Sequence, residues 1–353
     1  MRLAIAPNPL EPRQRKGPPP GPSTNPVAAR ESSTQDVYTR GIRSQRLATV
    51  KHVLDWPGTV ALERLDRSGA LDGQRDPGGK PSLLEQLARL ATAPLAPGLD
   101  RGRLMSDLVQ QVADPGLIQQ GDRGTCTVTT LEYSLARRDP AEYVRLVTGL
   151  ASPSGRVKTA GGKDLVRVED SLQDDRSSRT AASRLFEAAM MDLANGVVDY
   201  RNGADRHGFG PWTPFPGGLL SIQVARAATA LTGKPHEAVE VVPLLGRVPF
   251  TNWGIDGLMK GLRETLARHG EAPVMLDWRG QGEKTHSEHM VLVLKIEGNR
   301  VIFRNPWGNT GLTGSTTNGK SSPVRTREAS GGIESLSLED FRKRLQGFIR
   351  PER

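Results

Sequence analysis

The sequence predicts an α+β fold in which helices come first and a sheet follows. Two observations favour this class. Apolar residues recur at helical spacing in several segments before residue 195, and strand-like apolar runs dominate from about residue 238 onward. No internal repeat of fixed period is visible, so a chain of 353 residues has room for one large domain or two modest ones.

The first segment, residues 1–45, is expected to be a disordered tail rich in proline and arginine. Its prolines, which interrupt any helix, are Pro7, Pro9, Pro12, Pro18, Pro19, Pro20, Pro22 and Pro26. No apolar periodicity is present that folding would bury. We interpret the segment as a solvated tail. A secretion or targeting segment of an exported effector and a removable pro-segment are the alternatives.

Residues 46–112 are expected to form a small helical region with glycine- and proline-containing loops. Its clearest helical pattern, entered through Pro81 and Ser82, is the set of apolar side chains Leu83, Leu84, Leu87, Leu90 and Ala91. The sequence assigns no role to this region and leaves an inhibitory pro-region and a docking domain both open.

Residues 113–353 are expected to form the catalytic domain. Helices are predicted at 126–135, 141–150 and 182–195, and strands at 238–245, 273–278, 290–296 and 301–304. The order places the helical part before an antiparallel sheet.

The only cysteine, Cys126, opens the first of these helices after a glycine-rich approach that begins at Gln120. Thr125 is predicted to cap the helix, and a cysteine in the first turn is favoured as a thiolate by the free N–H groups there. The Gln120 amide and the Cys126 N–H are expected to hold an oxyanion, with Gln119 as the competing amide. A lone cysteine is more often a small buried hydrophobe, but such a residue needs no approach of this kind.

The predicted base is His289, at the start of an apolar strand, and Asn305 follows the next strand. The turn between these strands decides whether the two residues meet. A two-residue loop puts Asn305 opposite residue 292 and on the other face from His289, whereas a three-residue loop puts it opposite residue 291 and on the same face. We predict the second register.

Other histidines compete with His289. His286 is the nearest rival and is expected to lie in a surface loop, and a metal site made by His286, His289 and Glu288 lacks further ligands. The remaining histidines, which belong to no motif, are His52, His207, His236 and His269. Trp307 is predicted either to cover the bond between His289 and Asn305 or to be a core aromatic, and the two roles are compatible.

Around these residues the sequence resembles the calpain-like branch of papain-fold cysteine peptidases. The segment 120–126 is similar to that family's Gln-Gly-x-x-Gly-Asp-Cys, and Arg304 to Gly308 matches its Arg-Asn-Pro-Trp-Gly block. Weaker likenesses occur at 185–189, 231–233 and 335–341, so the resemblance covers about residues 117–348. Thr125 and Thr127 depart from the family's Asp and Trp, as Glu288 does from its Gly.

The resemblance implies a papain-like fold, with a helical subdomain carrying Cys126 packed on a β subdomain carrying His289 and Asn305. It also implies a thiol-dependent endopeptidase that acts on protein or peptide substrates through a thioester. The alternatives are an exported bacterial effector that deamidates or acylates side chains of a host or target-cell protein, and a non-catalytic interaction module. The sequence requires no cofactor. Members of the family often need calcium, but no carboxylate ligands can be matched here, so calcium is left open and no metal ligand is assigned.

Composition restricts partners and location. The net charge is +9, yet basic and acidic residues are interleaved through most of the chain, so no nucleic-acid partner is expected. No run approaches 18 apolar residues, which predicts no transmembrane helix, and no signal-peptide core is evident. One cysteine excludes an internal disulfide. The protein is therefore expected in the cytoplasm, or exported without a classical signal peptide.

Overall fold

The computed structural model describes residues 26–73, 79–209, 212–240, 254–278, 288–308 and 325–352. The chain divides into two compact units, residues 1–45 and 46–353. Helix α1 (Pro26–Val53) begins within the segment expected to be a disordered tail. The difference arises because Pro26 is the last proline before Pro57, and proline at the first position of a helix is tolerated.

The first part of the larger unit is helical. Its helices are α2 (Trp56–Arg67), α3 (Leu83–Thr92), α4 (Arg101–Ala113), α5 (Cys126–Arg138), α6 (Pro140–Ala151) and α7 (Ala181–Asn195), with short 3-10 turns η1 (Pro115–Leu117) and η2 (Glu169–Leu172). Side-chain caps begin several of them. Ser82 and Glu85 form a reciprocal capping box at α3, which is why this helix starts directly after Pro81-Ser82 as predicted.

Two small sheets and a further helix complete this part of the chain, one sheet between α6 and α7 and the rest after α7. They are the pair β1 (Arg156–Lys158) and β2 (Asp164–Val166), the three-stranded sheet β3 (Asp199–Arg201), β4 (Arg206–Phe209) and β5 (Trp212–Pro216), and helix α8 (Ser221–Thr232). None of these small strands was predicted. Each is three to five residues long, too short to show a period-2 pattern.

The second part is a seven-stranded antiparallel sheet with the order β10-β11-β9-β8-β7-β12-β6. Its strands are β6 (His236–Glu240), β7 (Ala272–Asp277), β8 (Glu288–Glu297), β9 (Arg300–Arg304), β10 (Thr326–Ala329), β11 (Ile333–Ser337) and β12 (Leu345–Pro351), with helices α9 (Ile255–His269) and α10 (Leu338–Arg344). The fold class is thus α+β. The predicted strand at 238–245 is present to residue 240, and its remainder lies outside the described residues.

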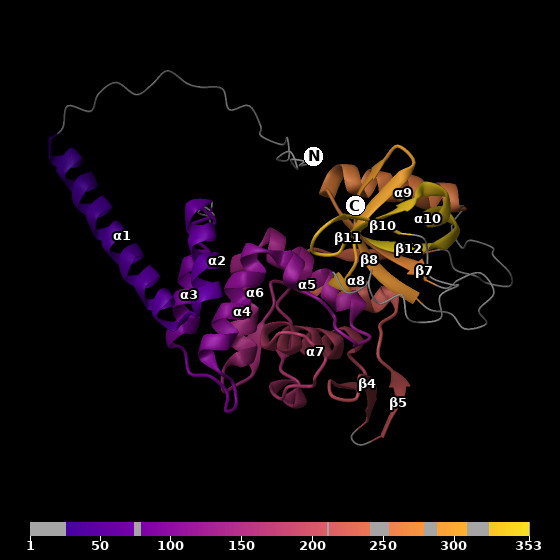
Figure 1. Cartoon of the computed structure of the whole chain (residues 1–353), viewed down its shortest axis with the longest axis horizontal. Coiled ribbons are helices and arrows are strands. Elements are labelled where there is room, and N and C mark those ends of the chain that lie inside the picture. The colour runs from indigo at the N-terminus through magenta and orange to yellow at the C-terminus, as the bar shows by residue number, and fades with distance from the viewer. Residues whose placement is uncertain are drawn as a thin grey trace. The chain divides into compact units, whose positions relative to one another are not determined.

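Strand β8 separates two hydrophobic cores. Met290 packs in the core shared with α5 and α8, whereas Val291 and Val293 pack in the core shared with α9 and α10. Both faces of β8 are therefore buried, as its near-continuous apolar sequence requires. Figure 1 shows α5 where the helices meet this sheet, in contact with β8. The first turn of α5 and the start of β8 are brought together by this packing.

Candidate active site

The sulfur of Cys126 lies at the junction between α5 and the sheet. The residue is half-buried at the first position of α5. The backbone N–H groups of Thr127, in the same turn, and of Met290, on β8, lie close enough to the thiol to lower its pKa. Because Met290 directly follows His289, the sulfur sits beside the strand that carries the predicted base.

The resting charge of Cys126 differs from the sequence expectation. Burial raises the pKa of the Cys126 thiol to about 11, and the nearby carboxylates of Asp205 and Glu187 raise it further, while the two backbone N–H groups lower it. Loss of hydration thus outweighs the favourable start of the helix. The thiol is the resting form near neutral pH, not the thiolate that the helix position alone predicts.

The predicted cap is also different. Thr125 occupies the N-cap position, but its side chain makes no hydrogen bond to the helix. Its hydroxyl donates instead to Glu187 at 2.7 Å, as does that of Thr129. A buried carboxylate competes successfully for the hydroxyl because an unpaired charge there would be costly. Arg179 pairs with the same Glu187 at 2.9 Å, so this ion pair lies directly beneath the nucleophile's helix.

The glycines before Cys126 are needed for the path of the loop. Gly121 has φ +61°, and a Cβ there would come within 1.7 Å of the Ser177 carbonyl oxygen. Gly124 donates its N–H to the Asp205 carboxylate at 2.7 Å. Both contacts hold the loop against segments far away in the sequence, and at Gly121 the close approach and the positive φ require glycine.

Gln120 is held next to Asn305 by backbone pairing across a long sequence distance. Its N–H donates to the carbonyl of Pro306 at 2.9 Å. Its side chain is buried; Nε2 donates to the Arg123 carbonyl, and Oε1 has no hydrogen-bond partner among the described residues. The competing amide, Gln119, turns away to the Ser178 carbonyl at 3.4 Å. Gln120, and not Gln119, is thus the amide that is buried beside Pro306, and its bond to Arg123 uses one of the two N–H groups of Nε2.

His289 and Asn305 are in direct contact. Nε2 of His289 lies 3.0 Å from Oδ1 of Asn305, and both residues are almost fully buried. The Asn305 oxygen also accepts from the backbone N–H of Trp307 at 3.1 Å. Since Oδ1 is an acceptor, the neutral imidazole carries its proton on Nε2 and leaves Nδ1 free to accept one.

The register between β8 and β9 puts His289 and Asn305 on the same face, as predicted, but the loop length and the pairing that produce it differ from the prediction. Glu297 pairs with Arg300, so the loop has two residues, not three. A bulge between Val293 and Lys295 then shifts the ladder by one, and Leu292 pairs with Arg304. The next pair in this shifted ladder is residue 291 with residue 305, which puts Asn305 on the face of His289.

Aromatic rings enclose the imidazole. Trp307 stacks on His289 with ring centres 4.3 Å apart, and Trp278 meets its edge at 4.7 Å. Burial lowers the pKa of His289 to about 4, opposed by the hydrogen bond to Asn305 and aided by the positive charges of Arg325 and Arg304. Trp307 also packs against the core of the sheet, so its position fits the predicted core role and places its ring on the imidazole. Trp278 was not predicted; it ends a strand and belongs to no motif.

One buried carboxylate next to the site was not predicted. Asn305 donates its Nδ2 to Oε2 of Glu334 at 3.1 Å, and Glu334 pairs with Arg325 at 3.0 Å. The signal was present in the sequence as a charged residue between Ile333 and the apolar β11 positions. A charge in such a run is either at the surface or paired inside, and the sequence alone does not distinguish the two.

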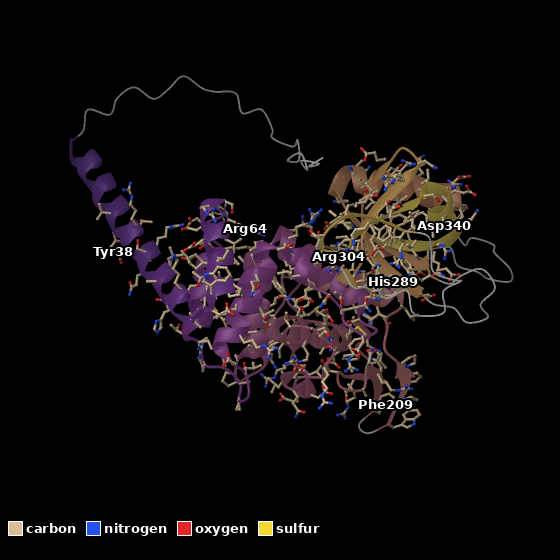
Figure 2. All side chains as sticks on the ribbon, viewed as in Figure 1. Tyr38, Arg64, Phe209, His289, Arg304 and Asp340 are labelled. Carbon is tan, nitrogen blue, oxygen red and sulfur yellow. The ribbon has the colours of Figure 1, made fainter. Side chains whose placement is uncertain are left out.

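Arg304 joins the two halves of the site from the sheet side. Its side chain donates to the Ile118 carbonyl, just before Gln120, and lies 4.7 Å above the Tyr133 ring of α5. Figure 2 shows Arg304 on the side of the sheet that meets the helices. The loop before Cys126 is therefore attached to β9 at Arg304 and at Pro306.

The other predicted candidates do not join this group. His286 lies outside the described residues. His52 and His269 are exposed, His236 is half-buried on β6, and His207 is buried beside the Tyr200 ring. Nowhere in the residues that the structure describes do three or more His, Cys, Asp or Glu side chains form a group able to hold a metal ion. Whether the protein uses calcium is therefore left open by the structure, as it is by the sequence.

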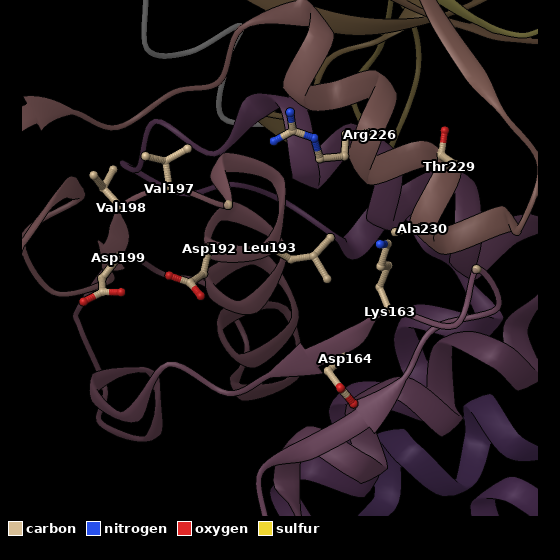
Figure 3. Close-up of a pocket in the computed structure, with 12 residues that line it drawn as sticks. Lys163, Asp164, Asp192, Leu193, Val197, Val198, Asp199, Arg226, Thr229 and Ala230 are labelled. Carbon is tan, nitrogen blue, oxygen red and sulfur yellow. The ribbon is translucent and has the colours of Figure 1, made fainter.

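A cavity of about 530 Å³ lies elsewhere, between α7, α8 and β2 (Figure 3). Lys163 and Arg226 line it together with Asp164, Asp192 and Asp199. None of the residues around Cys126 contributes to its wall, so the cavity is separate from the candidate active site.

No protein-family model matches the sequence, and a search of curated proteins finds no significant similarity. In the described parts of the chain, no helix combines the length and the hydropathy needed to cross a membrane. Function is therefore inferred from the chemistry of the site itself.

Proposed function

We propose that the protein is a thiol-dependent endopeptidase with a papain-like arrangement of its two parts. The observation that carries the proposal is the 3.0 Å bond from His289 Nε2 to Asn305 Oδ1, on a strand whose next residue contacts the Cys126 sulfur. A nucleophile, a base and the group that orients the base thus come from three segments of the chain. This is the arrangement that thiol hydrolysis requires.

The first half of the reaction uses the neutral pair. Nδ1 of His289 takes the thiol proton as the sulfur of Cys126 attacks the peptide carbonyl carbon. The carbonyl oxygen becomes an oxyanion, which the Cys126 N–H and the free amide hydrogen of Gln120 stabilise. The imidazolium then gives its proton to the leaving amine, and the C–N bond breaks to leave a thioester.

The second half returns the enzyme to its starting state. His289 removes a proton from water, the hydroxide attacks the thioester carbonyl, and the oxyanion forms again at the same donors. Collapse breaks the C–S bond, releases a carboxylic acid and returns the proton to sulfur. Asn305 keeps the same imidazole tautomer throughout, and the stacked Trp307 keeps water from its hydrogen bond with His289.

The order of the chain supports the papain-like arrangement. The proposed nucleophile starts a helix in the helical part, while His289 lies on β8 and Asn305 directly follows the adjacent strand β9 of the antiparallel sheet. The proposed substrate is a polypeptide, because the half-buried Cys126 lies at the junction of two structural parts and not in the separate cavity lined by α7, α8 and β2.

The test compares wild type with Cys126→Ala and with Asn305→Ala on an unstructured protein substrate, with and without calcium. We expect new peptide termini from wild type, none from Cys126→Ala, and a rate lowered at least about tenfold by Asn305→Ala because the imidazole loses its orientation. Mass spectrometry of the intact substrate identifies the products.

The same measurement separates the rival functions. A substrate that stays intact but gains about one mass unit, as Gln becomes Glu, would replace hydrolysis of the backbone by deamidation. Absence of any product in all conditions, together with no reaction of Cys126 with a thiol-directed acylating probe, would leave the interaction module and reject the enzyme.

A further inference from the structure

We propose that Glu334 is a positioning residue of the catalytic group, a fourth member that acts on His289 through Asn305. This inference rests on the proposed function. Glu334 does not touch the imidazole or the sulfur. Its role is to fix which end of the Asn305 amide faces His289 and to balance the charge of Arg325 beside the rings that enclose the imidazole.

The first argument is the polarity of the hydrogen bonds around the Asn305 amide. Oδ1 accepts from His289 at 3.0 Å and from the Trp307 N–H at 3.1 Å, while Nδ2 donates to Glu334 at 3.1 Å. A carboxylate only accepts hydrogen bonds. Rotation of the amide by half a turn would place Oδ1 against the carboxylate and Nδ2 against two donors, so Glu334 allows one orientation.

The second argument is burial. Asn305 and Glu334 are both 0% exposed, so water cannot replace a lost partner. The backbone holds both residues in register, because Glu334 lies opposite Phe303 in the β9–β11 ladder and the Asn305 N–H donates to the Gly332 carbonyl at 2.8 Å. The carboxylate is therefore delivered to the amide by the sheet and not by a flexible loop.

The third argument concerns charge. The Arg325 guanidinium lies 5.2 Å from the Trp278 ring centre and 5.8 Å from that of Trp307, the two rings that contact His289. A cation there opposes formation of an imidazolium, which the reaction needs in its first step. The carboxylate of Glu334, 3.0 Å from Arg325, offsets that cation.

A simple structural ion pair is the competing explanation, and Glu328 provides the matched control. Glu328 is on the neighbouring strand β10, is also paired with an arginine (Arg300), and accepts a hydrogen bond from Ser335 at 2.7 Å. Its partners in the part of the chain that the structure describes, Arg300 and Ser335, do not contact His289 or Asn305. Glu334→Gln and Glu328→Gln each replace an arginine-paired carboxylate of this sheet by an amide of the same size.

The experiment measures kcat, KM and the His289 ring by NMR in the full chain. We expect Glu334→Gln to lower kcat at least about tenfold with KM changed less than about twofold, since a neutral amide no longer fixes Asn305. The proton on His289 Nε2 should exchange faster with water than in wild type. Glu334→Asp, which keeps the acceptor-only carboxylate, should restore part of kcat, and Glu328→Gln should resemble wild type in both measurements.

Several outcomes would overturn the proposal. One is a kcat of Glu334→Gln within twofold of that of Glu328→Gln; another is an unchanged Nε2 proton signal. If Glu334→Gln does not fold, the double variant Glu334→Gln/Arg325→Met removes both charges, and it must show the same loss of kcat and the same faster exchange. Wild type without peptidase activity would reject the proposed function, whereas the NMR signature would still decide the role of Glu334.

Discussion

At the scale of single residues, the site combines a thiol that loses its proton less readily than usual with an imidazole that gains a proton less readily than usual. The pKa of Cys126 is raised to about 11 and that of His289 is lowered to about 4, both chiefly by burial. Near pH 7 the two groups are therefore neutral, and no standing thiolate–imidazolium pair is present. In the reaction that we propose, proton transfer must therefore accompany attack on the substrate, which makes the orientation of the imidazole more important than its charge at rest.

This resting state predicts how Cys126 reacts with iodoacetamide. Because the thiolate is the nucleophile, the alkylation rate of the wild-type protein should rise about tenfold per pH unit from pH 7 and level off only near pH 11. Mass spectrometry gives the rate directly, since the chain has a single cysteine. Free glutathione in the same buffers serves as the reference thiol. A rate that is flat between pH 5 and 8 would show a preformed ion pair instead.

At the scale of elements, the hairpin of β8 and β9 shows what sequence can and cannot supply. The strands and the shared face of His289 and Asn305 followed from pattern and spacing. The bulge near Leu294 did not, because an extra residue in an apolar run leaves no trace in its composition. The prediction made the loop one residue too long and missed the bulge. These two errors cancel, so His289 and Asn305 were correctly predicted to share a face.

The hydrogen-bond partners were less predictable than the elements. Thr125 was in the right place for a cap, but its hydroxyl is taken by Glu187 from another helix. Glu334 reaches Asn305 only because β11 pairs with β9. Both contacts join segments far apart in the chain, and local propensity contains no information about them.

The loop before α5 gives a prediction at this scale. Gly121→Ala should displace the loop and cost about 2 kcal/mol or more, because the φ of +61° is unfavourable for alanine and the new Cβ would overlap the Ser177 carbonyl. Chemical denaturation measures the loss of stability, and the peptidase rate per folded molecule measures the displacement of Gln120.

Gly162→Ala is the matched control for this change. Gly162 also has a positive φ, +75°, but a Cβ there would have open space around it. It should cost only about 1 kcal/mol and leave the peptidase rate unchanged. Equal losses for the two variants would show that strain alone, and not the contact with Ser177, matters at Gly121.

At the scale of the whole molecule, the sequence was sufficient for the class and the order of the parts, and insufficient for their charged interior. Helices first and sheet second is the observed order. Two features of the interior were not expected. Arg179 and Glu187 form a buried ion pair, and burial raises the pKa of Glu132 well above its usual value. Charged residues are usually exposed, so their burial becomes visible only in the assembled fold.

The stability of the larger unit should depend on pH through His289. Its pKa is lowered in the folded state, so the unfolded chain binds more protons between about pH 6.5 and pH 4, and stability falls as pH falls through this window. The whole pKa shift corresponds to a difference of roughly 3 kcal/mol in the free energy of unfolding between neutral pH and a pH below 4. Denaturation midpoints at pH 7 and pH 4.5 measure the effect.

His289→Gln supplies the comparison, because it removes the group that must be protonated on unfolding. Its midpoint should depend less on pH than that of wild type. Parallel curves for wild type and His289→Gln would contradict the assigned burial of the imidazole.

The attachments of the Gln120 loop have a consequence for how the protein is made. Arg304 and Pro306 hold this loop in place. Arg304 bonds to Ile118, which lies 186 residues earlier in the chain, and Pro306 bonds to Gln120. During synthesis, Cys126 therefore leaves the ribosome well before His289, Arg304 and Asn305. In the enzyme we propose, Cys126 could therefore not be activated during synthesis until His289 and Asn305 have been made and have packed against the loop before α5.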